Sequence, residues 1–198
     1  MYTVNEVFYS LQGEGIRAGT PNVFVRLSGC NLRCSVDNEA GFDCDTEFTS
    51  GNKMTLPELL ELMNSVDQGS KNVILTGGEP SLQVDEELIS ALKLDGWYIA
   101  IETNGTKELI EGFDWITVSP KSAEHTLKQL TAHELKYVRF HGMAIPKTKI
   151  DAQFRLISPA FEADWSVQNK VLKWCIKLVK QNPGWRLSVQ QHKLWGER

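Results

Sequence analysis

Three cysteines in one stretch of the chain have a spacing suited to a metal centre. Cys30 and Cys34 are separated by three residues, and Cys44 follows after nine more. Three thiolates on one loop can ligate three irons of a cubane cluster and leave the fourth iron open, as a catalytic centre requires. Structural zinc usually has four ligands, and the nearest histidine, His125, is far along the chain. The spacing favours an iron–sulfur cluster, and a non-catalytic zinc-binding module is the alternative.

The fourth cysteine, Cys175, lies in an apolar helical stretch and is expected to be a buried structural thiol. Nothing in the sequence supports export, because residues 1–6 lack the basic and apolar regions of a signal peptide. No apolar run approaches the roughly 20 residues that span a bilayer. We therefore expect a cytoplasmic protein, in which clustered cysteines bind metal rather than form disulfides.

The composition is that of an ordinary globular protein, with 41% hydrophobic and 23% charged residues among 198. This length suits one domain, residues 1–198, with an N-terminal extension over 1–20 and a cysteine loop over 28–46. The net charge of −4 and the isoelectric point of about 5.6 give no electrostatic reason to expect direct binding of nucleic acid or of an anionic membrane.

Strand-like and helix-like segments alternate along most of the chain. Helices are predicted over 55–66, where Thr55 and Glu58 can form a capping box, and over 85–94 and about 166–180. Repeated strand–helix units imply parallel strands joined by right-handed crossovers. Connecting helices are short or missing, notably between residues 114 and 140. We therefore predict an α/β fold, an incomplete and open (β/α)6-type partial TIM barrel. The strands are predicted at residues 22–27, 72–76, 97–103, 114–119, 136–141, 153–157 and 185–189.

Unusual residues follow the carboxyl ends of these predicted strands, where sheets of this class bind their ligands. Cys30 follows the first strand and Asn104 the third. Gly77-Gly78-Glu79 follows the second, and Ser119-Pro120-Lys121 the fourth. The sequence thus predicts one site at this end of the sheet, built from several loops.

Two motifs around the cysteines resemble the radical S-adenosylmethionine superfamily. They are Ser28-Gly29-Cys30-Asn31-Leu32-Arg33-Cys34, continued by Cys44-Asp45-Thr46, and Thr76-Gly77-Gly78-Glu79-Pro80. The second motif contacts the amino group of the cofactor's methionine in that superfamily, which suits glycines that allow close backbone approach and a carboxylate that can pair with an ammonium. The resemblance implies a [4Fe-4S] cluster and S-adenosylmethionine.

The cysteine loop departs from the superfamily, which separates its second and third cysteines by two residues including an aromatic. Here residues 35–43 stand between them, and we interpret them as an insertion in the loop. The entropic cost of closing a loop rises only slowly with its length, so the three cysteines of a longer loop can still ligate one cluster. Phe42, or the backbone from Asp43 to Asp45, would then take the contact to the adenine.

Four further segments resemble the 7-carboxy-7-deazaguanine synthase family within that superfamily, and the likeness extends from residue 5 to the end. The segments are Ser10-Leu11-Gln12-Gly13-Glu14-Gly15, Phe24-Val25-Arg26-Leu27, residues 101–106 with 118–121, and residues 185–193. The resemblance implies that an adenosyl radical takes a hydrogen from C6 of 6-carboxy-5,6,7,8-tetrahydropterin. The ring then contracts, ammonia leaves and 7-carboxy-7-deazaguanine forms, with the cofactor regenerated. It also implies Mg²⁺, an electron donor such as flavodoxin, and a homodimer.

The resemblance assigns roles to individual residues, although each could also be an ordinary strand-end, turn or surface residue. No protein acid or base is assigned, and His192 and Lys193 receive no role. The cluster ligands are Cys30, Cys34 and Cys44, and the Mg²⁺ ligand is Thr46. The substrate contacts are Leu11, Gln12, Gly13, Glu14, Arg26, Thr76 and the terminal Arg198. The cofactor contacts are Asp43, Asp45, Gly78, Glu79, Glu102, Asn104, Ser119, Pro120, Lys121, Ser158, Pro159, Ala160 and Phe161.

A second reading within the superfamily is an activase that makes a glycyl radical on a partner protein. Such an enzyme shares the three cysteines. It would not need Arg26, Thr46 or the loop at residues 11–15, which the family resemblance assigns to a small-molecule substrate and its metal.

Overall fold

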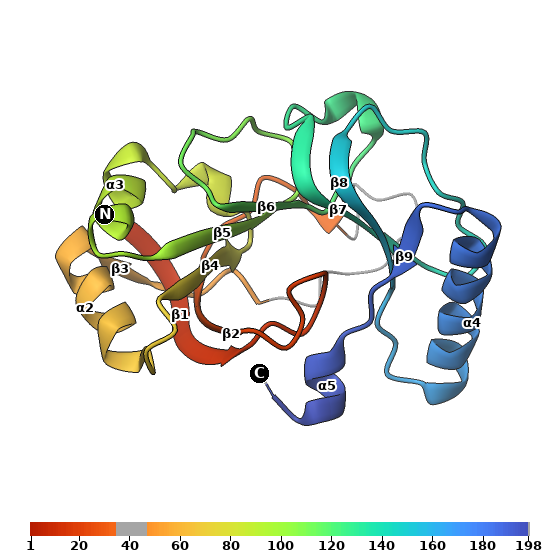
Figure 1. The fold of residues 1–198 in the computed structure, drawn as a ribbon, viewed down its shortest axis with the longest axis horizontal. Helices are drawn as coiled ribbons and strands as arrows, with labels where there is room; N and C mark the ends of the chain where they lie inside the picture. The colour runs from red at the N-terminus through yellow and green to blue at the C-terminus, as the bar shows by residue number, and fades with distance from the viewer. Residues whose placement is uncertain (35–46, 198) are drawn as a thin grey trace.

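The computed structural model describes residues 1–34 and 47–197, and this part of the chain forms one sheet (Figure 1). The strands are β1 (Tyr2–Leu11), β2 (Pro21–Leu27), β3 (Asn52–Met54), β4 (Asn72–Gly77), β5 (Tyr98–Thr103), β6 (Trp115–Val118), β7 (Thr131–Arg139), β8 (Asp151–Pro159) and β9 (Trp185–Leu187). Their order across the sheet is β3-β1-β2-β4-β5-β6-β7-β8-β9.

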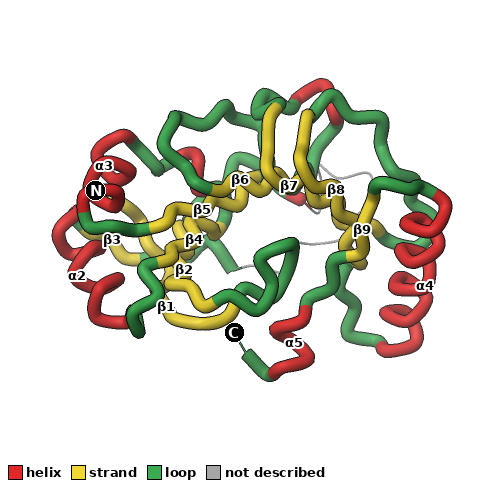
Figure 2. The backbone as a smooth tube through the Cα atoms, in the orientation of Figure 1, coloured by secondary structure: helices red, strands yellow, loops and turns green. Residues whose placement is uncertain are grey.

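All neighbours from β2 to β9 are parallel, while β1 runs antiparallel to β2 and to β3. Among the described residues β3 and β9 are the two edges, so the sheet stays open there. Figure 2 shows the strands as an arch with the loop after β1 inside it. This is the predicted partial barrel, and the carboxyl ends of its parallel strands lie along one rim.

The long helices lie outside the arch, and α5 lies near the loop after β1 (Figure 1). α2 begins as predicted, with the Thr55 N–H donating to Glu58 Oε2 at 2.7 Å and the Glu58 N–H donating back to Thr55 Oγ1 at 3.5 Å. The helices are α2 (Leu56–Val66), α3 (Glu86–Leu94), α4 (Trp165–Gln181) and α5 (Gln191–Trp195), with short 3₁₀ turns η1 (Pro80–Leu82) and η2 (Glu124–Thr126). In the described chain the connection from β6 to β7 carries only η2, as the sequence predicted.

Two apolar clusters hold the helices on the sheet. Leu59 and Met63 of α2, with Leu88 of α3, pack on the first half of the sheet. Val171 and Cys175 of α4 pack on the second half. Cys175 is completely buried, which raises the pKa of its thiol to about 11, so the prediction of an inert structural cysteine is confirmed. No helix of the described residues is long and apolar enough to cross a membrane.

The structure corrects the sequence predictions at β1, at β7 and at the C-terminus. Residues 2–11, predicted only as part of an extension, form the long strand β1 on the antiparallel side of the sheet. The strand predicted at 136–141 runs instead from Thr131 to Arg139, so its first half had been missed. The C-terminal helix α5 was likewise not predicted.

Candidate active site

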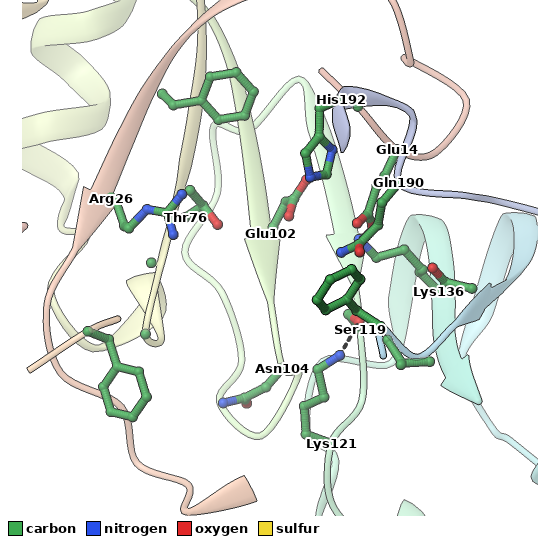
Figure 3. Close-up of a pocket in the computed structure, with 18 of the residues that line it drawn as sticks. Glu14, Arg26, Thr76, Glu102, Asn104, Ser119, Lys121, Lys136, Gln190 and His192 are labelled. Atoms are coloured by element: carbon green, nitrogen blue, oxygen red, sulfur yellow. Dashed lines mark hydrogen bonds and ion pairs between the residues drawn. The ribbon is translucent and has the colours of Figure 1, made fainter. Parts of the chain in front are cut away.

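A cavity of about 560 Å³ lies at the carboxyl ends of the parallel strands. The walls come from the loop after β1, the cysteine loop after β2, the ends of β4 to β8, and the C-terminal segment around α5. Figure 3 shows Glu14, Gln190 and Lys136 gathered on one side of this cavity and Arg26 with Thr76 on the other. The residues predicted from the strand ends therefore line a single cavity that opens to solvent.

The two described cluster cysteines, Cys30 and Cys34, line this cavity and are partly buried. The N–H of Leu32 points to Cys30 Sγ at 3.5 Å, a contact that suits a thiolate. Among the described residues no three histidine, cysteine, aspartate or glutamate side chains form a separate metal site. These partly buried thiols at the cavity wall thus fit the iron–sulfur ligands that the spacing predicted. The predicted ligands and contacts Asp43, Cys44, Asp45, Thr46 and Arg198 lie outside the described residues.

The cysteine loop is anchored on the glycine pair that ends β4. The N–H of Gly78 donates to the Leu27 carbonyl at 2.9 Å, and the N–H of Glu79 donates to the Gly29 carbonyl at 2.8 Å. A β-carbon on Gly77 would lie 2.0 Å from the Leu27 oxygen, and Gly77 has a φ of +126°. Glycine is therefore required where the end of β4 meets the root of the cysteine loop.

Glu79 itself is buried behind the cavity wall, with 1% of its surface exposed. Its Oε1 accepts from Thr103 Oγ1 at 2.6 Å and from the Ser81 N–H at 3.1 Å. Its Oε2 accepts from the Asn104 N–H at 2.7 Å. In this structure the carboxylate therefore ties the end of β5 to the Gly-Gly turn. Pro120, also predicted as a cofactor contact, is likewise buried.

An asparagine pair continues this connection to the cluster loop. Asn104 lines the cavity, and its Nδ2 donates to Asn31 Oδ1 at 3.0 Å. The amide of Asn31 in turn donates to Thr106 Oγ1 at 2.8 Å. Since Asn31 follows Cys30 directly, the loop after β5 holds the cluster loop by side-chain hydrogen bonds.

Arg26 and Thr76 stand side by side on neighbouring strands β2 and β4 and both line the cavity. Arg26 Nε lies 3.0 Å from Glu6 Oε1, as an ion pair in which the N–H makes no aligned hydrogen bond. The guanidinium also lies 5.9 Å from the centre of the Phe8 ring, which stacks on Phe24. This wall therefore presents a cation over aromatic rings, a surface that suits an anionic, planar ligand.

The opposite wall is lined by amide and carboxylate groups. Gln12 Nε2 donates to Glu102 Oε1 at 2.8 Å, and the N–H of Glu14 donates to Gln12 Oε1 at 3.2 Å. The Glu14 carboxylate forms an ion pair with Lys136 of β7. Burial works against the charge of Glu14, but Lys136, a hydrogen bond from Gln190 and the charge of Lys121 lower its pKa to about 2.

A third part of the rim carries the remaining predicted cofactor contacts. Lys121 Nζ donates to Ser119 Oγ at 3.1 Å. The segment that ends β8 lines the cavity with residues 158–161, of which Phe161 is half exposed. The ammonium of Lys193 in α5 lies 3.1 Å from the centre of the Phe161 ring, so the C-terminal helix contacts this segment.

Comparisons with known proteins identify the family. Residues 24–141 match the family model described as the Radical SAM superfamily. A 7-carboxy-7-deazaguanine synthase of Bacteroides thetaiotaomicron is 42% identical over 195 residues, which cover 98% of this chain and 97% of that protein. The chain belongs to the 7-carboxy-7-deazaguanine synthase family. A synthase of Burkholderia multivorans is 37% identical, with 97% of each chain covered. The crystal structure of QueE from Escherichia coli shares the fold, with a TM-score of 0.69 over 96% of this chain and 94% of that one at 24% identity.

Membership of this family makes the chain a radical S-adenosylmethionine enzyme with a [4Fe-4S] cluster. The described residues predicted for a 7-carboxy-7-deazaguanine synthase converge on one cavity, apart from Glu79 and Pro120. The cavity is lined by Leu11, Gln12, Gly13, Glu14, Arg26, Cys30, Cys34, Thr76, Gly78, Glu102, Asn104, Ser119, Lys121, Ser158, Pro159, Ala160 and Phe161.

Sequence reasoning missed several residues of the cavity. Lys136, Gln190 and His192 line it, and His192 was given no role. The β-carbon of a residue at Gly13 would meet His192 Nδ1 at 2.0 Å, so the C-terminal segment lies directly against the loop after β1. Lys136 carried a local signal, because Glu134 and Lys136 alternate with the apolar Leu135 and Tyr137, a pattern that points two charges to the same face of the strand.

Proposed function

We propose that this cavity binds S-adenosylmethionine beside 6-carboxy-5,6,7,8-tetrahydropterin, and that the enzyme converts the pterin to 7-carboxy-7-deazaguanine with loss of ammonia. The observation that supports this most strongly is the single cavity that is lined both by the thiols of Cys30 and Cys34 and by Arg26 and the Gln12–Glu14 loop. An activase for a partner protein would need no such small-molecule wall, so the cavity favours the pterin.

In this proposal Arg26 binds the carboxylate of the pterin, since a guanidinium can meet a carboxylate with two parallel hydrogen bonds. Thr76 lies next to Arg26 in the sheet register and adds a hydroxyl. The amide of Gln12 accepts and donates hydrogen bonds at the pyrimidine edge of the ring, and the carboxylate of Glu14 accepts them. We place Glu102 with them, on the substrate side rather than the cofactor side, because it holds the amide of Gln12 at 2.8 Å.

On the cofactor side Cys30 and Cys34, with Cys44, hold the cluster. When bound, the cluster and S-adenosylmethionine supply an electron and a carbon-centred radical. The backbone of Gly78 and the side chains of Asn104, Ser119 and Lys121 hold and orient the cofactor. Residues 158–161 and α5 exclude water from its other side, which protects a radical from stray hydrogen donors.

Further parts of the proposal depend on the family resemblance. Thr46 would help to hold a Mg²⁺ ion, which would supply positive charge for the substrate carboxylate, consistent with the small number of protein oxygens that this metal uses. An electron donor such as flavodoxin reduces the cluster, and the enzyme is a homodimer. Residues 1–198 form a single radical S-adenosylmethionine domain, which is supported by the continuous sheet under both apolar clusters.

The test is turnover by anaerobically reconstituted enzyme with S-adenosylmethionine, Mg²⁺, a reductant and the carboxypterin. We expect a product with the mass of 7-carboxy-7-deazaguanine, dependent on every component, and a slower reaction when Mg²⁺ is removed. A substitution on the substrate side tests the two sides of the cavity separately. Arg26→Gln should raise the KM for the pterin while the cluster remains intact. A reconstituted enzyme that cleaves S-adenosylmethionine but leaves the pterin unchanged would contradict the proposal.

A further inference from the structure

We propose that Lys136 is a positioning residue that keeps the Glu14 carboxylate ionised and fixed in the wall that receives the pterin. This inference deepens the proposed function and rests on it. It assigns a role to a residue of β7 that the motifs around the cysteines and the glycines do not include.

Lys136 points from β7 into the cavity rather than into the apolar core. Its neighbours Leu135 and Tyr137 are buried in the second apolar cluster on the other face of the strand. The side chain of Lys136 is 9% exposed and that of Glu14 is 13% exposed, and the two form an ion pair. Both line the cavity, and Figure 3 shows them together beside Gln190.

The loop that carries Glu14 is held in place by β7 and by the C-terminal segment after β9. The N–H of Ile16 donates to Glu134 Oε1 at 2.6 Å, and the N–H of Gly15 donates to Ser188 Oγ at 2.9 Å. The Gln191 N–H donates to the Gly13 carbonyl at 2.8 Å. The backbone on both sides of Glu14 is therefore fixed, and Lys136 fixes the end of its side chain.

The surroundings of Glu14 are rich in carboxylates. The charges of Glu102 of β5 and Glu134 of β7 both raise the pKa of Lys136. Burial raises the pKa of Glu134. Lys136 and Lys121, which lies beyond β6, are the cations that act on Glu14. Arg17 of the same loop acts on Glu102 and Glu134, and the imidazole of His192 lies against Gly13. Without Lys136, three carboxylates would share this space, and such groups take up protons because like charges oppose ionisation.

The charge of Glu14 matters for the pterin because an ionised carboxylate only accepts hydrogen bonds, whereas a protonated one also donates. The pyrimidine edge of a pterin presents its amino and ring N–H groups as donors. An ionised Glu14 complements these donors, and a protonated Glu14 sets an O–H against them. Lys136 therefore acts on substrate binding through the protonation state of Glu14.

The test measures binding of fluorescent 6-carboxypterin to the reconstituted holoenzyme from about pH 5.5 to 7.5, alongside turnover. Lys136→Met should weaken binding at least about tenfold at neutral pH, which corresponds to about 1.4 kcal/mol, and binding should improve as the pH rises. Lys136→Arg should bind nearly as the parent does. Lys93→Met breaks an exposed ion pair with Asp114 on the outside of the arch and is the matched control.

Coupling to Glu14 distinguishes a positioning role from a general structural one. In a Glu14→Gln background, adding Lys136→Met should change the dissociation constant by less than about threefold and should remove the improvement with pH, because there is no carboxylate left to ionise. If Lys136→Met fails to fold, Lys136→Gln, which can still donate a hydrogen bond to Glu14, is measured instead.

Two results would overturn the inference: a folded Lys136→Met enzyme that binds 6-carboxypterin like the parent, or effects of the two substitutions that add fully. A parent enzyme that neither binds nor converts the pterin would instead contradict the proposed function. The two failures are therefore distinguishable.

Discussion

Gly78 packs so closely against Gly29 that a β-carbon on Gly78 would lie 2.1 Å from the Gly29 carbonyl oxygen and 3.2 Å from Cys30 Cβ. The glycine pair of the Gly-Gly-Glu-Pro motif therefore has a structural role in addition to any contact with the cofactor. It lets the end of β4 approach the residue that precedes the first cluster cysteine. This contact couples the geometry of the cluster loop to the sheet.

Replacing Gly78 by alanine should displace the cluster loop, because the added methyl group cannot fit against backbone. We expect iron bound per chain to fall and S-adenosylmethionine cleavage to drop on the order of 100-fold, as for ångström-scale misplacement of a reacting group. Iron analysis and cleavage assays measure this. Gly184→Ala is the control for backbone strain without a steric clash. Alanine is strained there because Gly184 has a φ of +101°, but an added β-carbon has no atom within 4 Å. Equal iron loss in both variants would refute the specific contact.

Replacing Glu79 by glutamine should destabilise the protein by about 1–3 kcal/mol, because the amide sets a donor against the N–H and O–H groups that now donate to the carboxylate. Urea unfolding measures the loss. Glu86→Gln is the control, because Glu86 is exposed on α3 and its replacement should change the free energy of unfolding little. If Glu79→Gln keeps full stability but loses affinity for S-adenosylmethionine, the buried carboxylate acts on the cofactor rather than on the fold.

The Glu14–Lys136 pair should make stability depend on pH at both ends of the range. The pKa of Glu14 is lowered from 4.5 to about 2. The contribution of the Glu14 carboxylate to the free energy of unfolding is therefore complete above about pH 4.5 and is lost as the pH falls toward 2. The pKa of Lys136 is raised by its carboxylate neighbours despite burial, so its contribution is complete below its ordinary pKa and is lost only at more alkaline pH.

Urea unfolding at about pH 6 and about pH 3 tests the acid limb. We expect this pair to account for on the order of 2 kcal/mol of the stability lost between them. The double variant Glu14→Gln with Lys136→Met should lose correspondingly less. An identical pH dependence in the parent and the double variant would show that Glu14 titrates in the folded protein as it does in the unfolded chain.

Replacing Cys44 and replacing Cys175 should have different effects. Cys44→Ala should abolish S-adenosylmethionine cleavage, because we propose Cys44 as the third cluster ligand. Cys175→Ala should leave cleavage intact and cost about 1 kcal/mol of stability, since it removes a completely buried sulfur. Iron content and cleavage distinguish the two. Loss of iron on replacing Cys175 alone would contradict the assignment.

The sequence predicted the parallel strands and the ligand-bearing rim because both leave local signals. Apolar runs that stop at glycine, asparagine or proline mark strand ends, and β4 and β5 lie where those signals placed them. β1 was not predicted as a strand, because both of its faces are covered and its apolar and polar residues therefore do not alternate cleanly. Phe8 lines the cavity, whereas Val7 and Tyr9 pack on the first apolar cluster. A bulge between Val4 and Glu6 further disturbs the alternation.

The charged wall of the cavity could be predicted only in part. Lys136 and Glu14 are 122 residues apart in the sequence and meet only because the loop after β1 enters the arch. Local patterns carry no information about such a pairing. The same holds for Glu79, whose burial depends on Thr103 and Asn104 at the end of another strand.

In the proposed reaction, one cavity brings the carbon radical of the cofactor to C6 of the pterin. The most direct measurement uses pterin deuterated at C6 and follows the label by mass spectrometry during anaerobic turnover. Transfer from C6 to the 5′ carbon should give deuterated S-adenosylmethionine alongside unlabelled 7-carboxy-7-deazaguanine, in the parent and in Cys175→Ala alike. Product formed while S-adenosylmethionine stays free of deuterium would contradict the account.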